Sequence, residues 1–111
     1  MSKSYYEPKD LKKFHEIGRV NTNLSDKFFE YYNEVMKEGA LSEKEKALIA
    51  LAISHALKCP YCIDSYTTTC MQKGADERQM NEAVHVAAAM AAGINLVHSI
   101  QMNNKLDELQ V

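Results

Sequence analysis

Apolar residues recur at every third or fourth position along most of this chain, and no stretch alternates with a period of two. The first spacing gathers apolar side chains on one face of a helix, whereas a strand needs the second. Six segments carry the helical pattern: residues 10–20, 25–39, 42–58, 60–73, 76–93 and 95–109. The only prolines are Pro8 and Pro60. The sequence therefore predicts an all-α protein of about six helices, folded as a single domain over residues 1–111.

Capping signals mark several ends of these helices. Asn23 or Ser25 is expected to cap the second helix. Ser42, followed three residues later by Glu45, forms a capping box ahead of an apolar run. Asp76 is expected to open the fifth helix. Glycines stand at the expected ends of the second, fourth and fifth helices: Gly39, Gly74 and Gly93.

The composition excludes several classes of protein. The hydrophobic fraction is 46% and the net charge is −2, which argues against a disordered chain and against a nucleic-acid binder. No uninterrupted apolar run reaches membrane-spanning length, and residues 1–13 are studded with charges where a secretion signal would be apolar. Three cysteines, an odd number, argue against a secreted disulfide framework. We therefore expect a cytoplasmic protein with neither nucleic acid nor membrane as a partner.

The run from Ala83 to Ala92 is rich in alanine. Small side chains let helix backbones approach closely, which suits either a core or a subunit interface. Several predicted helices also have apolar faces too wide for a chain of this length to cover alone. These features predict a homo-oligomer.

Two cysteines separated by two residues form the motif Cys59-Pro60-Tyr61-Cys62. Proline suits the first position of a helix, which would put Cys59 at the N-cap and Cys62 in the first turn. Unpaired backbone N–H groups and the helix dipole stabilise a thiolate there. In a chain without a secretion signal, this spacing indicates redox or metal chemistry.

Three other side chains are candidates for the surroundings of the two sulfurs. If the helices on either side of the motif form an antiparallel hairpin, His55 lies level with Cys62, and it also precedes Cys59 by about one turn. If the helix after the motif folds back on the next one, His85 lies within roughly a turn of the same level. Tyr66 follows Cys62 by four residues and shares its face of the helix.

This set of residues suits a thiol peroxidase. The thiolate is the nucleophile, so another group must take its proton and later protonate the oxygen that leaves the peroxide. Histidine titrates in the right range for both steps. The first product is a sulfenic acid, which a second cysteine close by converts to a disulfide.

Residues 47–54 followed by C-P-Y-C resemble the core of the carboxymuconolactone decarboxylase-like superfamily, and within it the alkylhydroperoxidase D-like thiol peroxidases. The similarity spans roughly residues 41–106. It implies the alkylhydroperoxidase D-like helical fold, trimers or hexamers, and reduction of a hydroperoxide substrate at the expense of an external thiol reductant or redox protein. It also implies that Cys62 attacks the peroxide and Cys59 resolves the product, with no cofactor or metal. The muconolactone decarboxylases proper lack the cysteine pair, which disfavours decarboxylation.

Two positions depart from that family's pattern. The family has a glutamate twelve residues before the first cysteine, where this chain has Ala47, and a histidine four residues after the second, where it has Tyr66. We hypothesise that His55 acts as the base and that Tyr66 and His85 complete the proton relay. The chain also resembles a subgroup with H-x-x-x-C-P-Y-C, some of whose members are named as peroxidase-like proteins associated with arsenosugar biosynthesis.

Two alternatives compete with peroxidase activity. One is a thiol–disulfide oxidoreductase, since C-P-Y-C is familiar from glutaredoxins; that fold needs a strand before the motif and a later cis-proline, and this chain has neither. The other is a helical zinc-binding module, whose tetrahedral ligands would be His55, Cys59, Cys62 and His85. The third cysteine, Cys70, is expected to be a small buried hydrophobe.

Overall fold

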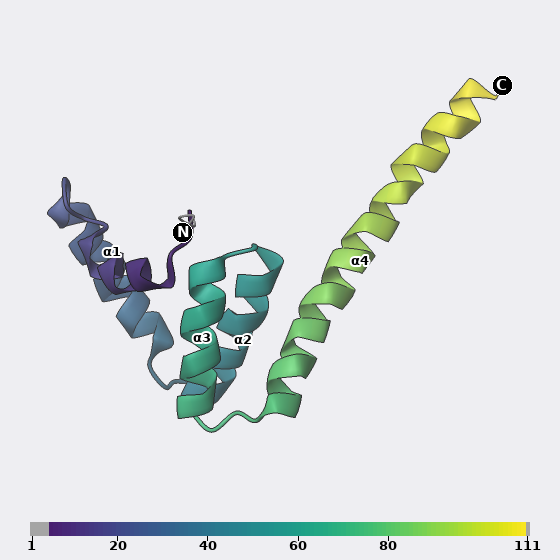
Figure 1. Ribbon diagram of the computed structural model, residues 1–111. Coiled ribbons are helices and arrows are strands. Elements are labelled where there is room, and N and C mark those ends of the chain that lie inside the picture. The colour runs from purple at the N-terminus through teal and green to yellow at the C-terminus, as the bar shows by residue number, and fades with distance from the viewer. Residues whose placement is uncertain (1–4, 111) are drawn as a thin grey trace.

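The computed structural model describes residues 5–110, which form five helices and no strand (Figure 1). The elements in chain order are the 3-10 helix η1 (Pro8–Glu16) and the α-helices α1 (Thr22–Met36), α2 (Glu43–Ala56), α3 (Pro60–Gln72) and α4 (Glu77–Leu109). The prediction of an all-α protein is confirmed. The count differs from six because the last two predicted helices are one.

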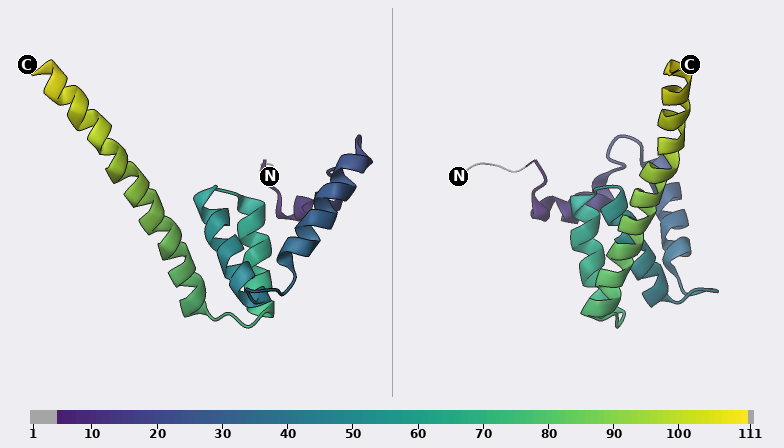
Figure 2. Two further views of the ribbon diagram at one scale, coloured as in Figure 1. Left: turned by 180° about the vertical axis from the view of Figure 1, so that it is seen from behind. Right: turned by 90° about the vertical axis from the view of Figure 1, so that its right-hand side faces the viewer.

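Helices α2 and α3 form an antiparallel pair in the middle of the molecule, and α1 and α4 slope away from it on opposite sides (Figures 1 and 2). Helix α2 packs on both α3 and α4, while η1 contacts α3 and α1 contacts α2. The hairpin of α3 and α4 that was considered for the placement of His85 does not form, because α4 packs on α2. Helix α2 is therefore the central element of the fold.

Side-chain caps fix the starts of α2 and α4. The Ser42 backbone N–H donates to the Glu45 carboxylate at 2.8 Å and the Glu45 N–H donates to the Ser42 hydroxyl at 3.1 Å, which confirms the predicted capping box. The hydrogen bond from the Ser42 backbone holds the pKa of the Glu45 carboxyl below its ordinary value. Asp76 and Gln79 form a second capping box at the start of α4.

The first two helices differ from their predicted bounds. The segment predicted as a helix over residues 10–20 is a 3-10 helix that ends at Glu16. Helix α1 has Asn21 as its N-cap, in place of Asn23 or Ser25, because the Ser25 hydroxyl instead donates back to the Thr22 carbonyl at 3.1 Å.

The end of α1 also lies earlier than predicted, at Met36 and not at Gly39. The Lys46 ammonium donates to the Val35 carbonyl at 2.6 Å and also to the Lys37 carbonyl. These carbonyls at the end of the helix are satisfied by a side chain of α2, so no further helical turn is needed.

Helix α4 continues through the position where a break was predicted. Gly93 lies inside it, and a side chain there would meet no atom within 4 Å. A single glycine costs a helix only about 1 kcal/mol relative to alanine, less than the loss of the backbone hydrogen bonds that a break would cause. By contrast, Gly74 ends α3 as predicted, with a positive φ of 89° that favours glycine.

Helix α4 is also long and apolar enough, by length and composition, to cross a membrane. No uninterrupted apolar run reveals this property, because residues 83–104 contain polar side chains, although they include no Asp, Glu, Lys or Arg. The core helix of a soluble protein passes the same test, so the property does not assign α4 to a membrane.

The core lies between α2, α3 and the start of α4. Its buried apolar residues are Ala47, Leu51, Cys70 and Ala75, with Leu48, Tyr66 and Met80 packed against them. Cys70 is fully buried, as predicted, and burial raises the pKa of its thiol. The core fixes the central helix pair, and most of the other large apolar side chains on the described residues stay exposed.

We expect Leu51→Ala to lower the free energy of unfolding by about 2–5 kcal/mol, because Leu51 is only 2% exposed and its removal leaves a cavity between α2 and α3. Leu51→Met, which nearly conserves volume, should cost less than about 1.5 kcal/mol. Urea denaturation followed by circular dichroism measures both. Equal losses for the two variants would contradict the assignment of Leu51 to a tightly packed core.

Candidate redox site

The two cysteines of the motif are joined by a disulfide at the start of α3, with their Cα atoms 5.2 Å apart. Cys59 is the N-cap of α3 and Pro60 its first residue, as the sequence predicted. The Cys62 backbone N–H donates to the Cys59 sulfur at 3.2 Å. The cap role that Ser or Asp usually fills is therefore filled here by a sulfur atom.

The turn between α2 and α3 holds Cys59 from its other side. The Lys58 N–H donates to the His55 carbonyl at 3.2 Å and the Cys59 N–H donates to the Ser54 carbonyl at 2.9 Å. This pair of bonds is a Schellman motif, which places the residue after the helix cap in the left-handed region. Lys58 occupies that position with φ 56°. Cys59 thus closes one helix through its N–H and opens the next through its sulfur.

The disulfide lies in the wall of a cavity of about 540 Å³. The cavity is lined mainly by apolar side chains of η1, α1, α2 and α3, among them Phe14, Phe28 and Ile53. Phe14 also stacks edge-on against Phe28, Phe29 and Tyr32, which joins η1 to α1. A pocket with apolar walls and a few polar groups is the usual form of a small-molecule site.

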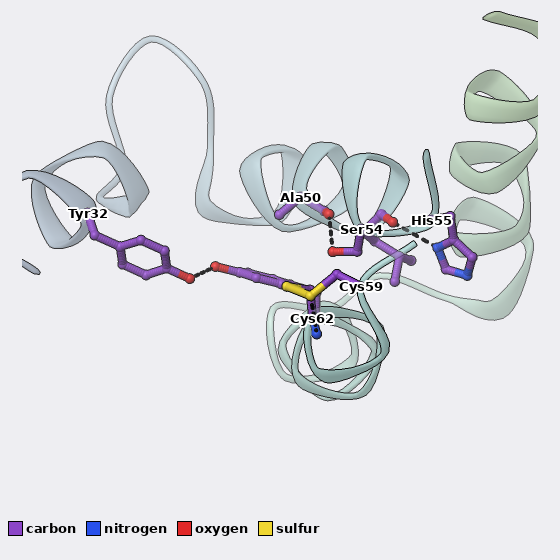
Figure 3. Close-up of a disulfide and its surroundings, with 8 residues drawn as sticks. Tyr32, Ala50, Ser54, His55, Cys59 and Cys62 are labelled. Carbon is purple, nitrogen blue, oxygen red and sulfur yellow. Dashed lines mark hydrogen bonds between the residues drawn. A yellow bond between two sulfur atoms is a disulfide. The ribbon is translucent and has the colours of Figure 1, made fainter. Parts of the chain in front are cut away.

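Hydroxyl groups on the cavity wall supply its polar character. Tyr66, one turn after Cys62, lines the cavity with both cysteines, as expected for a side chain on the same face of α3 as Cys62. Its hydroxyl is hydrogen-bonded to that of Tyr32 from α1 (Figure 3). Burial raises the pKa of the Tyr32 phenol. Ser54, buried on α2, lines the same cavity and donates its hydroxyl proton to the Ala50 carbonyl at 2.6 Å.

The two histidines proposed for the relay are not among the residues that line the cavity. His55 lies on the opposite side of the disulfide from Tyr32 (Figure 3), and its Nδ1 is 2.8 Å from the Leu51 carbonyl oxygen. Because a carbonyl only accepts, Nδ1 carries a proton and donates it to this oxygen. His85 is exposed on α4, which packs on α2 and not beside Cys62 on α3. The role of both imidazoles stays a prediction.

The zinc alternative finds no support in the geometry. Among residues 5–110, no three His, Cys, Asp or Glu side chains are grouped so that they could hold a metal ion. The proposed ligands His55 and His85 therefore do not converge with the cysteines on one point.

Sequence reasoning missed Tyr32 and Ser54. Tyr32 follows Phe28 and Phe29 at helical spacing, so its residue type and spacing predict only an apolar contact. Its pairing with a residue 34 positions away leaves no trace in local spacing. Ser54 did carry a signal: a small polar residue in an apolar helix, about one and a half turns before the first cysteine, indicates a side chain that is buried for its hydroxyl.

The fold and the site together define an all-α protein with a C-x-x-C dithiol/disulfide pair at a helix N-terminus, open to an apolar cavity. The sequence profile of the Carboxymuconolactone decarboxylase family matches residues 23–102, and the chain belongs to this family, within the alkylhydroperoxidase D-like superfamily.

Two proteins illustrate this relationship. A protein of Paracoccus denitrificans described as "Uncharacterized protein 4 in cox locus" is 34% identical over 102 residues, which is 92% of this chain and 92% of that protein. The crystal structure of a protein from Methanobacterium thermoautotrophicum, solved by a structural genomics consortium, superposes with a TM-score of 0.72 at 28% identity. The superposition covers 76% of this chain and 94% of that one.

We expect Lys58→Gly to raise the stability of the reduced protein by about 0.5–1 kcal/mol, because glycine removes the steric cost of the left-handed conformation at this position. Lys58→Val should lower it by more than about 1 kcal/mol, since a β-branched side chain tolerates that region least. Urea denaturation measures both. Lys58→Ala, which removes the ammonium but keeps Cβ, is the matched control; if it stabilises as much as glycine, charge and not backbone conformation governs the position.

Proposed function

We propose that this protein is a thiol-dependent peroxidase that reduces hydroperoxides through a Cys62/Cys59 dithiol–disulfide cycle. The observation that carries the proposal is the position of the pair: two sulfurs close enough to bridge, in the wall of an apolar cavity. The sulfurs supply the redox chemistry, and the cavity can receive the organic part of a hydroperoxide.

In the first step, the Cys62 thiolate attacks the peroxide. An S–O bond forms, the O–O bond breaks, and the leaving oxygen takes a proton and departs as an alcohol, so Cys62 becomes a sulfenic acid. In the second step, the Cys59 thiolate attacks the Cys62 sulfur and forms the S–S bond, the S–O bond breaks, and the leaving hydroxide takes a proton from solvent to become water. An external dithiol then reduces the disulfide and is itself oxidised.

The family resemblance implies that Cys62 attacks the peroxide. The hydrogen bond from the Cys62 N–H to the Cys59 sulfur makes Cys59 suitable as the resolving cysteine, which attacks the sulfenic acid on Cys62. The N–H of Cys62 stabilises negative charge on the Cys59 sulfur. A stabilised thiolate is available at neutral pH to attack the sulfenic acid, and it is also the better leaving group when an external thiol attacks Cys62. We place this cycle in the cytoplasm, where external thiols are kept reduced.

Trapping the oxidised sulfur tests the proposal. Reduced protein is treated with one equivalent of cumene hydroperoxide, or of hydrogen peroxide, in the presence of dimedone, and analysed by mass spectrometry. We expect the wild type to lose two hydrogen atoms as the disulfide forms, Cys59→Ser to acquire dimedone on Cys62, and Cys62→Ser to acquire none. The apolar cavity should make cumene hydroperoxide the faster oxidant.

Cys70→Ser is the matched control, since the buried Cys70 lies outside the cavity wall, and it should behave as the wild type. Dimedone on Cys59 in Cys62→Ser would reverse the two roles. A wild type that exchanges with a mixed disulfide but does not react with either peroxide would favour the oxidoreductase alternative.

We also propose that the chain functions as a homo-oligomer of three or six copies, as the family resemblance implies. Its accessible surface is 9137 Å², against about 6,200 Å² expected for a compact protein of this mass. The radius of gyration is 19.0 Å, whereas a compact domain of this length has a radius of gyration of roughly 13 Å. The excess of about 2,900 Å² is in the range that obligate interfaces bury.

The surface that would be covered lies on α4. Exposed apolar side chains on one face of this helix follow each other at spacings of three or four: Val86, Met90, Ile94, Val97 and Ile100. Such a stripe is the pattern of a helix that packs against another helix.

A charge within this stripe should dissociate the oligomer. We expect Val97→Asp to lower the mass measured by sedimentation equilibrium to that of one chain, because a carboxylate cannot be buried there without a partner. Asn95→Asp, on nearly the opposite side of α4, adds the same charge and should leave the assembly intact. A monomeric wild type, or dissociation by both variants alike, would contradict the assignment.

A further inference from the structure

A pair of phenols connects α1 to α3 across the cavity. The hydroxyl of Tyr32 is hydrogen-bonded to that of Tyr66, and both side chains line the cavity that the cysteines share. Tyr66 is one helical turn from Cys62, and its ring also packs against the core. The phenol of Tyr66 is thus held in place from two sides, in the wall of the cavity that also contains the sulfur oxidised in the proposed cycle.

Peroxide cleavage needs a proton donor in this cavity. The oxygen that leaves an alkyl hydroperoxide does so as an alkoxide, which is a far stronger base than a phenolate, so a phenol can protonate it. Neither His55 nor His85 lines the cavity, and the Ser54 hydroxyl already donates its proton to the Ala50 carbonyl. Burial raises the pKa of Tyr32, which keeps its phenol protonated at neutral pH.

We propose that Tyr66 donates the proton to the leaving oxygen and that Tyr32 is the positioning residue that orients and re-protonates it. As the Cys62 thiolate forms the S–O bond, the O–O bond breaks and the Tyr66 proton passes to the leaving oxygen, which departs as an alcohol. The Tyr66 phenolate takes the proton of Tyr32, and solvent restores the latter. This inference rests on the proposed peroxidase function.

The proposal can be tested by how the rate of oxidation depends on the group that leaves the peroxide. Peracetic acid releases acetate, which needs no proton at neutral pH, whereas tert-butyl hydroperoxide releases an alkoxide. Stopped-flow measurement of a single oxidation of the reduced protein by each oxidant separates proton donation from a general change in the site. The variants are Tyr66→Phe and Tyr32→Phe, with Tyr5→Phe as the control, since Tyr5 is 89% exposed.

We expect Tyr66→Phe to slow the reaction with tert-butyl hydroperoxide by about 100-fold, and Tyr32→Phe by about tenfold, as for loss of a general acid and of the group that orients it. Both should slow peracetic acid by less than about threefold, and Tyr5→Phe should slow neither. Phenylalanine keeps the ring that packs on the core, so the fold should persist, which circular dichroism checks.

Equal slowing with both oxidants, or no slowing with either, would overturn the assignment of the tyrosine pair while leaving the peroxidase function in place. A wild type that neither oxidant converts to the disulfide would overturn the peroxidase function, and the proton donation with it. The two failures are therefore distinguishable in one experiment.

Discussion

The site depends on the way in which one residue joins two helices. The N–H of Cys59 satisfies a carbonyl at the end of α2, and its sulfur satisfies an N–H at the start of α3. Each bond removes an orphan group that a helix end would otherwise leave unpaired. Because both helices pack on the same core, the position of the sulfur follows from the position of the helices, and no separate loop has to hold it.

Helix α2 contributes to both the core and the cavity because different faces of the helix contact each of them. Ala47 and Leu51 point into the core, while Ile53 and Ser54 line the cavity. The side chain of His55 points to neither, and bonds instead to its own helix. Ala47 stands where the family pattern that this motif resembles has a glutamate. At a fully buried position beside Leu51, a carboxylate would need a partner, and alanine removes that need.

The features that the sequence predicted correctly are helix starts and ends, which depend on local chemistry. The capping box of Ser42, the end of α3 at Gly74 and the N-cap role of Cys59 each depend on a few neighbouring residues, and each is confirmed. The continuity of α4 through Gly93 was not predicted, because glycine alone is a weak stop and no proline or capping residue accompanies it. The pairing of α4 with α2 likewise depends on tertiary packing, which a hairpin rule of adjacent helices does not represent.

The pairing of Tyr32 with Tyr66 belongs to the same group of long-range features. This pairing and the hydrogen bond to the Cys59 sulfur are the two polar interactions on which the proposed cycle depends. That sulfur accepts an N–H in the disulfide, but a thiolate in the same place would accept it more strongly because the acceptor then carries a charge. The cap therefore favours the reduced state over the oxidised one, as helix N-termini do in strongly oxidising dithiols. In the proposed cycle, this preference favours reduction of the disulfide by an external thiol, a property that a structural crosslink does not need.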